Sequence, residues 1–186
     1  AEGILVTNDH VVDRCTTIEV ENSQTKFSAA IIARNKDFDL AALKLSGKPL
    51  ANLNLFSEAP FALQNVIVAG YPFGDKVSTG VKFNLGIISS LAGPLNDPTL
   101  YQIDAAVQPG NSGGPVVNET GSLVGVMRAK LDETIIRRAF GVAPENMNFA
   151  INMKTLLKFL EENKILYELD KEEIRDRKTV SETLDK

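Results

Sequence analysis

Length, composition and charge set the first limits on what this chain can be. Its 186 residues are 44% hydrophobic and 24% charged, which is enough to bury a substantial core in one domain or a closely packed pair. The net charge of −4, without a basic run interleaved with aromatic residues, argues against a nucleic-acid partner. The single cysteine, Cys15, excludes an intrachain disulfide and is expected to be a small buried apolar residue.

The first predicted elements are short runs rich in valine and isoleucine, separated by turn residues, as is typical of β-strands. Alternation in TTIEVE (16–21) indicates a strand with one solvated face, which belongs to an antiparallel sheet. Residues 46–65 lack sustained periodicity and are interpreted as the connection between two β units, with the division near residue 58. The expected strands are 4–7, 16–21, 27–34 and 41–45, followed by 66–71, 83–91, 100–104, 115–118, 123–128 and 148–151.

A change of period near residue 152 predicts a closing helix. Asn152 suits the N-cap position, and the residues with helical spacing are Met153, Leu156, Leu157 and Leu160. The charged segment that follows is either a solvated helix or linker, or a helix that docks on a partner. The expected organisation is therefore a first β unit at 1–58, a second at 59–152, a helix at 153–163 and a charged tail or linker at 164–186.

Three polar residues are weak signals singly but have complementary chemistry. His10 is the only histidine, Asp39 lies in DFDLAALKL, and Ser112 lies in PGNSGGPVV. Each also has a structural interpretation: a satisfied histidine, a turn cap, and a tight turn before a strand. A serine hydroxyl needs an adjacent base, imidazole can fill that role, and a carboxylate fixes the imidazole tautomer. Gly110 can turn its N–H inward beside that of Ser112 and so stabilise an oxyanion; the opposite orientation would leave the site latent.

These motifs, in this order, resemble the trypsin-fold serine proteases, and most closely the HtrA/Deg family. The resemblance covers roughly residues 3–160 and rests on TNDHVV, DLAALKL and QPGNSGGPVVN, with further agreement from GIISSL and NFAIN. It implies an all-β fold of two six-stranded antiparallel β-barrels with a C-terminal helix. It also implies that His10 is the general base, Asp39 its orienting carboxylate and Ser112 the nucleophile, with Gly110 and Ser112 N–H groups in the oxyanion hole. Asp37 is a rival carboxylate, but in the family the acid directly precedes LA, which selects Asp39.

The function that this resemblance implies is peptide-bond hydrolysis by a serine endopeptidase, through an acyl-enzyme, in protein quality control. No metal or organic cofactor is expected, because one histidine and one cysteine cannot assemble a zinc site of the usual nitrogen and sulfur type. The implied substrates are unfolded or exposed polypeptides, and the implied homo-oligomer is a trimer. The implied location is periplasmic, or extracytoplasmic and membrane-anchored.

The resemblance places the substrate pocket at Ala106, six positions before the nucleophile, and along the strand Met127, Arg128, Ala129 and Lys130. Because Ala106 carries no charge, a trypsin-like preference for lysine or arginine is not expected. HtrA relatives favour small aliphatic residues in this pocket. Relatives usually have uncharged residues where this chain has Arg128 and Lys130. Lys130 would favour acidic residues if it faced the pocket; in the alternative, both side chains extend into solvent.

Two segments depart from the family pattern. The additional strand with a GSGF-like motif does not precede His10, so the first barrel is expected to be incomplete, with four assignable strands against six in the second. We expect that the chain is a fragment of a longer protein; completion by another chain is the alternative. The PDZ domain that usually follows in HtrA proteins is also missing from this sequence. Residues 131–148 form a longer loop than the family has, either a regulatory element or an inert insertion.

Two other functions stay open on the sequence. A catalytically latent trypsin-fold module that binds peptides or partners fits the incomplete barrel and the altered pocket. A glutamyl-specific protease of the bacterial secreted type fits Lys130, whereas SGGP and NFAI fit that type less well.

Overall fold

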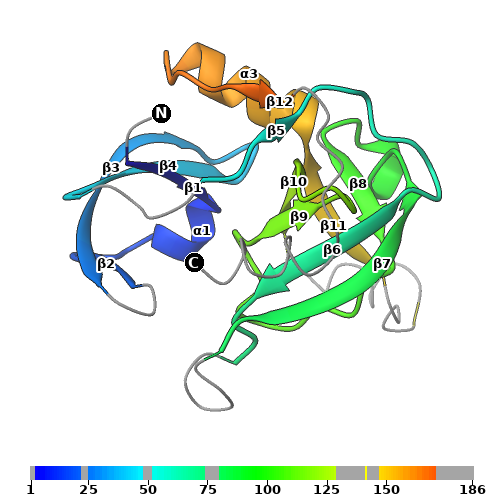
Figure 1. Ribbon diagram of the computed structural model, residues 1–186, viewed down its shortest axis with the longest axis horizontal. Helices are drawn as coiled ribbons and strands as arrows, with labels where there is room; N and C mark the ends of the chain where they lie inside the picture. Colours follow the sequence, from blue (N-terminus) through cyan, green and yellow to red (C-terminus); the bar gives the residue numbers. More distant parts are fainter. Residues whose placement is uncertain are drawn as a thin grey trace.

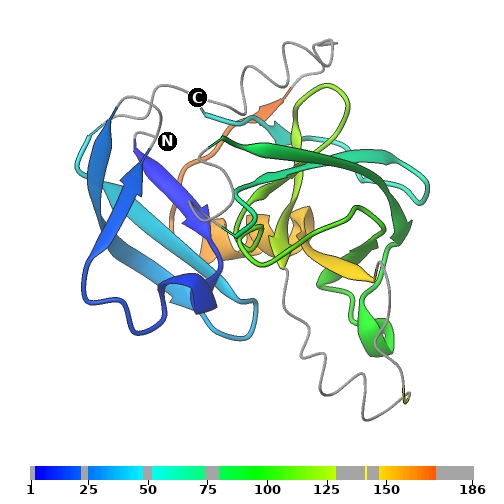
Figure 2. The same ribbon diagram turned by 90° about the horizontal axis from the view of Figure 1, so that it is seen from below.

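Two β-sheets lie side by side, with one helix across their junction (Figure 1). The structure is a computed structural model, and it describes residues 3–21, 25–47, 52–73, 80–128, 141 and 147–170. The first sheet, blue to cyan, and the second, mainly green, are clearly separate when seen from below (Figure 2). The candidate catalytic residues come from both sheets, so their relative position depends on how the sheets pack.

The first sheet is an open half-barrel of four antiparallel strands in the order β1–β4–β3–β2. Its concave face buries Val12, Ala41 and Leu43, with Leu5 and Ile31 partly buried against them. A one-turn helix, α1, leaves β1 and carries His10. The bounds are β1 Ile4–Thr7, α1 Asp9–Val12, β2 Ile18–Glu21, β3 Lys26–Asn35 and β4 Leu40–Leu45.

The second sheet contains a closed barrel of six strands in the order β11–β8–β7–β6–β9–β10, closed by pairing of β10 with β11. Apolar side chains fill its interior, among them Val68, Ile103 and Met127. The described residues confirm the expected fold class: a complete second barrel, four strands of the first, and a C-terminal helix. The bounds are β6 Asn65–Gly70, β7 Lys82–Ser90, β8 Leu100–Ile103, β9 Pro115–Val117, β10 Leu123–Arg128 and β11 Asn148–Asn152, with a 3₁₀ turn at Pro94–Asn96.

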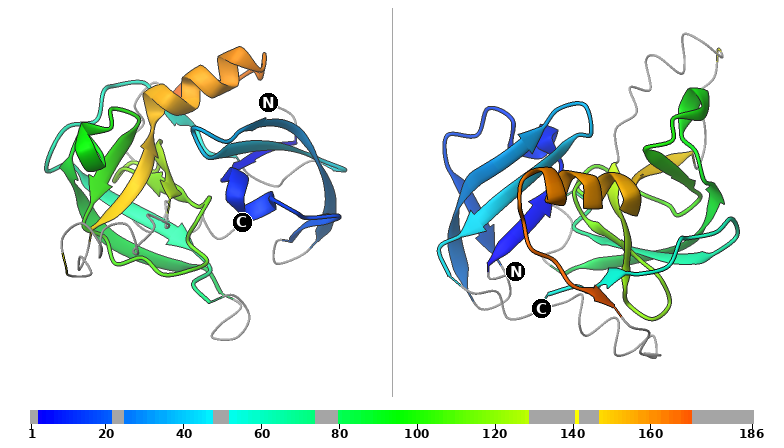
Figure 3. Two further views of the ribbon diagram at one scale, coloured as in Figure 1. Left: turned by 180° about the vertical axis from the view of Figure 1, so that it is seen from behind. Right: turned by 90° about the horizontal axis from the view of Figure 1, so that it is seen from above.

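The helix α3, Met153–Glu162, covers the junction between the two sheets (Figure 3). Its buried face, including Leu156 and Phe159, joins one apolar cluster with Leu40 of β4 and Ile151 of β11. After α3 the chain returns along the connection between the sheets, where β12 (Leu169–Asp170) pairs with β5 (Leu55–Phe56) in parallel (Figure 1). The helix and this return segment therefore tie the two sheets together.

Asn152 caps α3 and also anchors it to the second barrel. Its Oδ1 accepts the Thr155 N–H at 2.9 Å, and its Nδ2 donates to the Pro98 carbonyl at 2.7 Å. Replacing Asn152 by alanine removes both bonds in a buried position, so we expect the free energy of unfolding to fall by about 2 kcal/mol. Chemical denaturation measures this change. Lys154→Ala, at an exposed position of the same helix, is the control and should change stability by less than about 0.5 kcal/mol; equal effects would contradict the capping role.

Two expectations from composition concern Cys15 and the membrane. Cys15 is exposed, so its expected burial is wrong. It follows α1 in a surface turn, outside the apolar clusters of both sheets, and its sulfur lies 3.8 Å from the Val11 carbonyl. Across the described ranges, no helix is long and apolar enough to cross a membrane.

Candidate active site

His10 and Asp39 form a hydrogen-bonded pair at the edge of the half-barrel. His10 Nδ1 lies 2.8 Å from Asp39 Oδ2 and 3.0 Å from Oδ1, and the backbone N–H of His10 donates to Oδ1 at 3.0 Å. Because a carboxylate only accepts, the Nδ1 atom must carry the proton. The other ring nitrogen, Nε2, is then unprotonated in the neutral imidazole and is available as a base.

The turn between β3 and β4 presents Asp39 to the histidine. Asp39 adopts a left-handed backbone conformation with φ of 55°, and the Asn8 side chain holds its carbonyl through a 3.0 Å bond. Both residues are buried, whereas Asp37, the rival carboxylate, is exposed and forms no hydrogen bond to His10. Asn8 lies two residues before the histidine, within the TNDH motif, but the sequence pattern alone predicts no role for its side chain. Its amide fixes the turn that orients the carboxylate.

Opposing effects set the pKa of Asp39. Burial opposes its ionisation and acts to raise the pKa. The hydrogen bonds from the His10 side chain and backbone, with the charges of His10 and Arg128, outweigh burial and hold the pKa below the ordinary aspartate value. Asp39 is therefore ionised at neutral pH and can stabilise an imidazolium.

Ser112 lies on a tight turn that packs against the end of β1. Gly113 and Gly114 follow it and form backbone hydrogen bonds to Met127 and Asn111, at 2.9 and 3.0 Å. Gly113 has φ of 80°, and a Cβ there would collide with the Thr7 hydroxyl and approach Asn8 N to 3.1 Å. Glycine thus lets the serine turn approach the corner from which α1 carries His10. Within the described part of the chain, no hydrogen bond joins Ser112 to His10, as is common before substrate binds.

The backbone N–H groups around Ser112 divide into bonded and free ones. Those of Asn111, Gly113 and Gly114 donate to backbone carbonyls. Those of Gly110 and Ser112 have no acceptor in the described structure, and both residues line the same groove. An oxyanion requires donors that are not already bonded, so these two free N–H groups are the candidates for that role.

The Gly110 N–H has a fixed orientation because its peptide plane is held from the other side. The Pro109 carbonyl accepts the Phe73 N–H at 2.8 Å. In a trans peptide the carbonyl and the N–H point in opposite directions, so the Gly110 N–H points away from Phe73. Gly110 has φ of 106°, which glycine adopts readily. No local sequence pattern indicates this role of Phe73.

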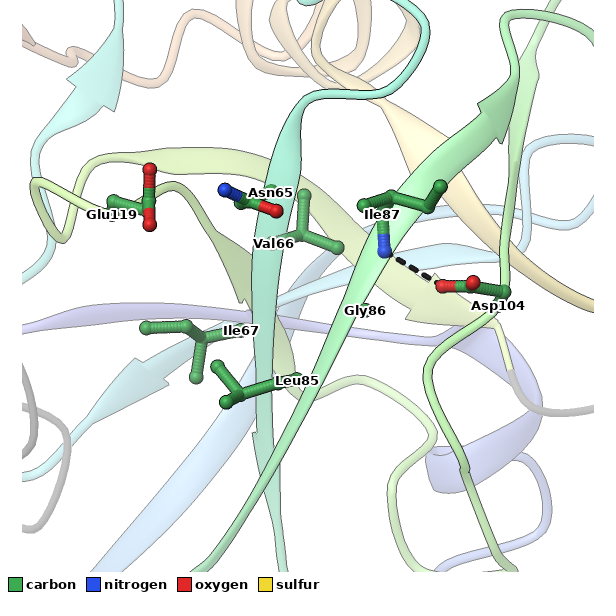
Figure 4. Close-up of a pocket in the computed structure, with 8 residues that line it drawn as sticks. All are labelled: Asn65, Val66, Ile67, Leu85, Gly86, Ile87, Asp104 and Glu119. Carbon is green, nitrogen blue, oxygen red and sulfur yellow. Dashed lines mark hydrogen bonds between the residues drawn. The ribbon is translucent and has the colours of Figure 1, made fainter.

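The groove that contains Ser112 has a volume of about 830 Å³ and lies between the two sheets. β1 forms one wall, and the other includes Gly110, Ser112 and residues of β6 and β10. A second, smaller pocket of about 230 Å³ lies over β6 and β7, where the Asp104 carboxylate accepts the Ile87 N–H at 2.7 Å (Figure 4). None of the predicted site residues lines this second pocket, so the groove is the candidate active site.

The structure separates the five residues predicted to line the substrate pocket. Ala106 is exposed, as a surface contact requires. Met127 is fully buried in the core of the second barrel, and its backbone supports the serine turn through Gly113 and Gly114. Its side chain does not line the groove, and a contact of its backbone with substrate stays a prediction. Ala129 and Lys130 lie outside the described residues, as does most of the predicted loop 131–148.

Arg128 takes neither of the positions that the sequence suggested. Its side chain does not extend freely into solvent; Nε lies 3.3 Å from Asp39 Oδ2, and the side chain is 28% exposed. The strand β10 points it across the junction of the sheets, toward the buried carboxylate. The charge of Arg128 is therefore directed at Asp39.

No candidate metal site accompanies these groups. Among the residues that the structure describes, no cluster of three histidine, cysteine, aspartate or glutamate side chains is arranged to hold a metal ion. The chemistry available from the described groups is thus a serine hydroxyl, an imidazole paired with a carboxylate, and two free N–H groups.

Known proteins are similar to this chain in sequence and in architecture. Residues 1–126 match the profile of the trypsin-like peptidase domain. An uncharacterised protein of Sinorhizobium fredii is 39% identical over 86% of this chain and 25% of that protein. The periplasmic serine endoprotease DegP of Salmonella typhimurium is 35% identical over 70% of this chain and 28% of that protein.

A solved structure extends the similarity to three dimensions. The HtrA-type protease AlgW, determined with a decapeptide, has a TM-score of 0.72 and 29% identity, covering 88% of this chain and 49% of that one. The chain therefore spans about a quarter of the length of the curated relatives and half of this structural neighbour.

Proposed function

This chain belongs to the trypsin-like peptidase domain family, and we propose that it is the protease domain of an HtrA/Deg-type serine endopeptidase. The observation that carries the proposal is the His10–Asp39 pair at the edge of the half-barrel, together with two free N–H groups beside Ser112, which lines the groove between the sheets. The first supplies a base with a fixed tautomer, and the second supplies donors for an oxyanion.

In the proposed mechanism, Ser112 Oγ attacks the carbonyl carbon of a peptide bond while His10 Nε2 removes its proton. The carbonyl oxygen becomes an oxyanion, which the N–H groups of Gly110 and Ser112 stabilise. The imidazolium, held by Asp39, then gives its proton to the leaving amine as the carbon–nitrogen bond breaks. A water molecule, deprotonated by His10, attacks the acyl-enzyme and releases the acid.

The proposed substrates are exposed or unfolded polypeptide segments. The AlgW structure, to which this chain is similar, was determined with a decapeptide, which supports a polypeptide as the class of ligand. The uncharged Ala106 and the commitment of Arg128 to Asp39 favour small uncharged side chains before the cleaved bond, and they weaken the glutamyl-specific alternative. Lys130 lies outside the described residues and adds nothing to either choice.

The proposed context follows from the relatives. DegP of Salmonella typhimurium is named as a periplasmic serine endoprotease, which supports an extracytoplasmic location. A role in protein quality control is proposed on the family resemblance. Assembly into a trimer, as the family resemblance implies, belongs to the same proposal. These functions are proposals for the whole protein, because the chain covers only 25% and 28% of the lengths of the two curated relatives.

Covalent labelling of Ser112 tests the proposal. A fluorophosphonate should form one adduct, located at Ser112 by peptide mass spectrometry, and the protein should cleave denatured casein. Ser112→Ala should lose both activities, whereas Ser28→Ala, at an exposed position of β3, should retain them. Peptide binding without labelling or cleavage would instead support the alternative function, a catalytically latent module that binds peptides. The open edges of the described half-barrel favour that alternative. Equal cleavage by the wild type and Ser112→Ala would refute the proposed nucleophile.

A further inference from the structure

Arg128 brings a second cation to the carboxylate that His10 uses. Its Nε lies 3.3 Å from Asp39 Oδ2, the same oxygen that lies 2.8 Å from His10 Nδ1. The Asp39 side chain is 9% exposed, so water screens this contact weakly. The Nε atom is buried and forms no hydrogen bond, which makes the contact an ion pair rather than a directed bond.

The other charged groups near the pair are engaged elsewhere or exposed. Asp9 of α1 and Asp13, which follows the helix, both bind Arg34 of β3, so the guanidinium compensates one of these two negative charges. The remaining charged groups on the neighbouring segments are exposed, namely Arg14, Lys36 and Asp37. Among the described residues, Arg128 is thus the one cation besides His10 with an ion pair to Asp39.

We propose that Arg128 is a positioning residue: its guanidinium shares Asp39 with His10 and thereby sets the pH above which the imidazole can act as a base. Two cations compete for one carboxylate, so each reduces the benefit that the other gains from it. With Arg128 in place, charging of the imidazole is less favourable than beside Asp39 alone. Removal of the Arg128 charge should therefore make protonation of His10 more favourable, and the variants below measure that change.

The same contact also joins the two sheets at the catalytic pair. Asp39 belongs to the turn between β3 and β4, whereas Arg128 ends β10 of the closed barrel. A purely structural role would reduce activity at all pH values without changing how His10 titrates. The pH dependence therefore separates the two roles.

The single histidine of the chain permits a direct measurement. The imidazole Hε1 signal of His10 can be followed by proton NMR against pH in the Ser112→Ala background, which prevents self-cleavage. Replacing Arg128 by methionine removes the charge and keeps an apolar stem, so the titration midpoint should rise by about one pH unit. Arg128→Lys keeps the charge and should return the midpoint toward that of the parent. If Arg128→Met does not fold, Arg128→Gln also removes the charge, and its titration midpoint can be compared with that of the parent instead.

An unchanged midpoint in the folded methionine or glutamine variant, or a lysine variant that behaves like methionine, would overturn the proposal. Its catalytic consequence rests on the proposed function: with Ser112 present, the acidic limb of the kcat/KM profile should move upward with the NMR midpoint. A protein that shows the NMR shift but cleaves no peptide would contradict the proposed function and leave the Arg128 inference intact.

Discussion

Replacing Asp39 by asparagine is expected to lower kcat/KM by about 10³- to 10⁴-fold while the protein remains folded. The carboxylate does two things that an amide cannot do together. It accepts a hydrogen bond from the Nδ1–H group of His10, and it compensates the positive charge that His10 gains in the proposed reaction. Asparagine offers either an oxygen without charge or an N–H group that would reverse the imidazole tautomer.

Asparagine is the right substitution because of the backbone at this position. The φ of 55° lies in the left-handed region, which asparagine tolerates and most residues avoid. Asp39→Ala would combine loss of the carboxylate with backbone strain, and the two effects could not be separated. The Asn8 amide that binds the residue 39 carbonyl remains in place in the asparagine variant.

Asp37→Asn is the matched control for this prediction. It removes one carboxylate from the same turn, but from an exposed position without a hydrogen bond to His10. Peptidase kinetics and circular dichroism of both variants are the measurements. Comparable loss in the two variants, or full activity in Asp39→Asn, would show that Asp39 is not the orienting carboxylate.

Gly110→Ala should reduce kcat by about 10²- to 10³-fold through loss of an oxyanion donor. A Cβ at this position would collide with the Tyr71 carbonyl and lie 3.1 Å from Phe73 N, and φ of 106° is unfavourable for alanine. Relief of these contacts requires the peptide between Pro109 and Gly110 to rotate. The rotation breaks the bond from Phe73 to Pro109 and turns the Gly110 N–H out of the groove.

Gly141→Ala controls for the backbone strain alone. Gly141 has φ of 74°, but a Cβ there would meet no atom within 4 Å. It should therefore show a modest loss of stability and unchanged kcat. Steady-state kinetics with a peptide substrate, together with the affinity of a peptide boronate that mimics the tetrahedral adduct, test the prediction. Unchanged boronate affinity in Gly110→Ala would exclude its N–H as an oxyanion donor.

The strands that the sequence predicted best are those with strong local patterns. The second barrel follows the predicted runs closely, as with 66–71 against Asn65–Gly70 and 148–151 against Asn148–Asn152. The two shortest strands, β5 and β12, fall in segments interpreted as a connection and a charged tail. Each is two residues long and exists only because a partner lies beside it, so no local periodicity could reveal it.

The sequence alone determined which groups are available for chemistry. It identified one imidazole, a carboxylate ahead of a buried strand, and a serine among glycines, because these depend on residue identity and on local turn chemistry. The approach of Asp39 rather than Asp37 to His10 was expected only from the family resemblance; its geometry came from the tertiary structure.

Packing between the sheets sets the directions of the Arg128 and Met127 side chains, and it determines which N–H groups near Ser112 stay free. Arg128 and Asp39 come from different sheets, and the bond that orients Gly110 comes from Phe73, in a loop distant in sequence. Such contacts arise from packing between sheets and loops. Their outcome depends on the distance and angle between elements, which local residue patterns do not encode.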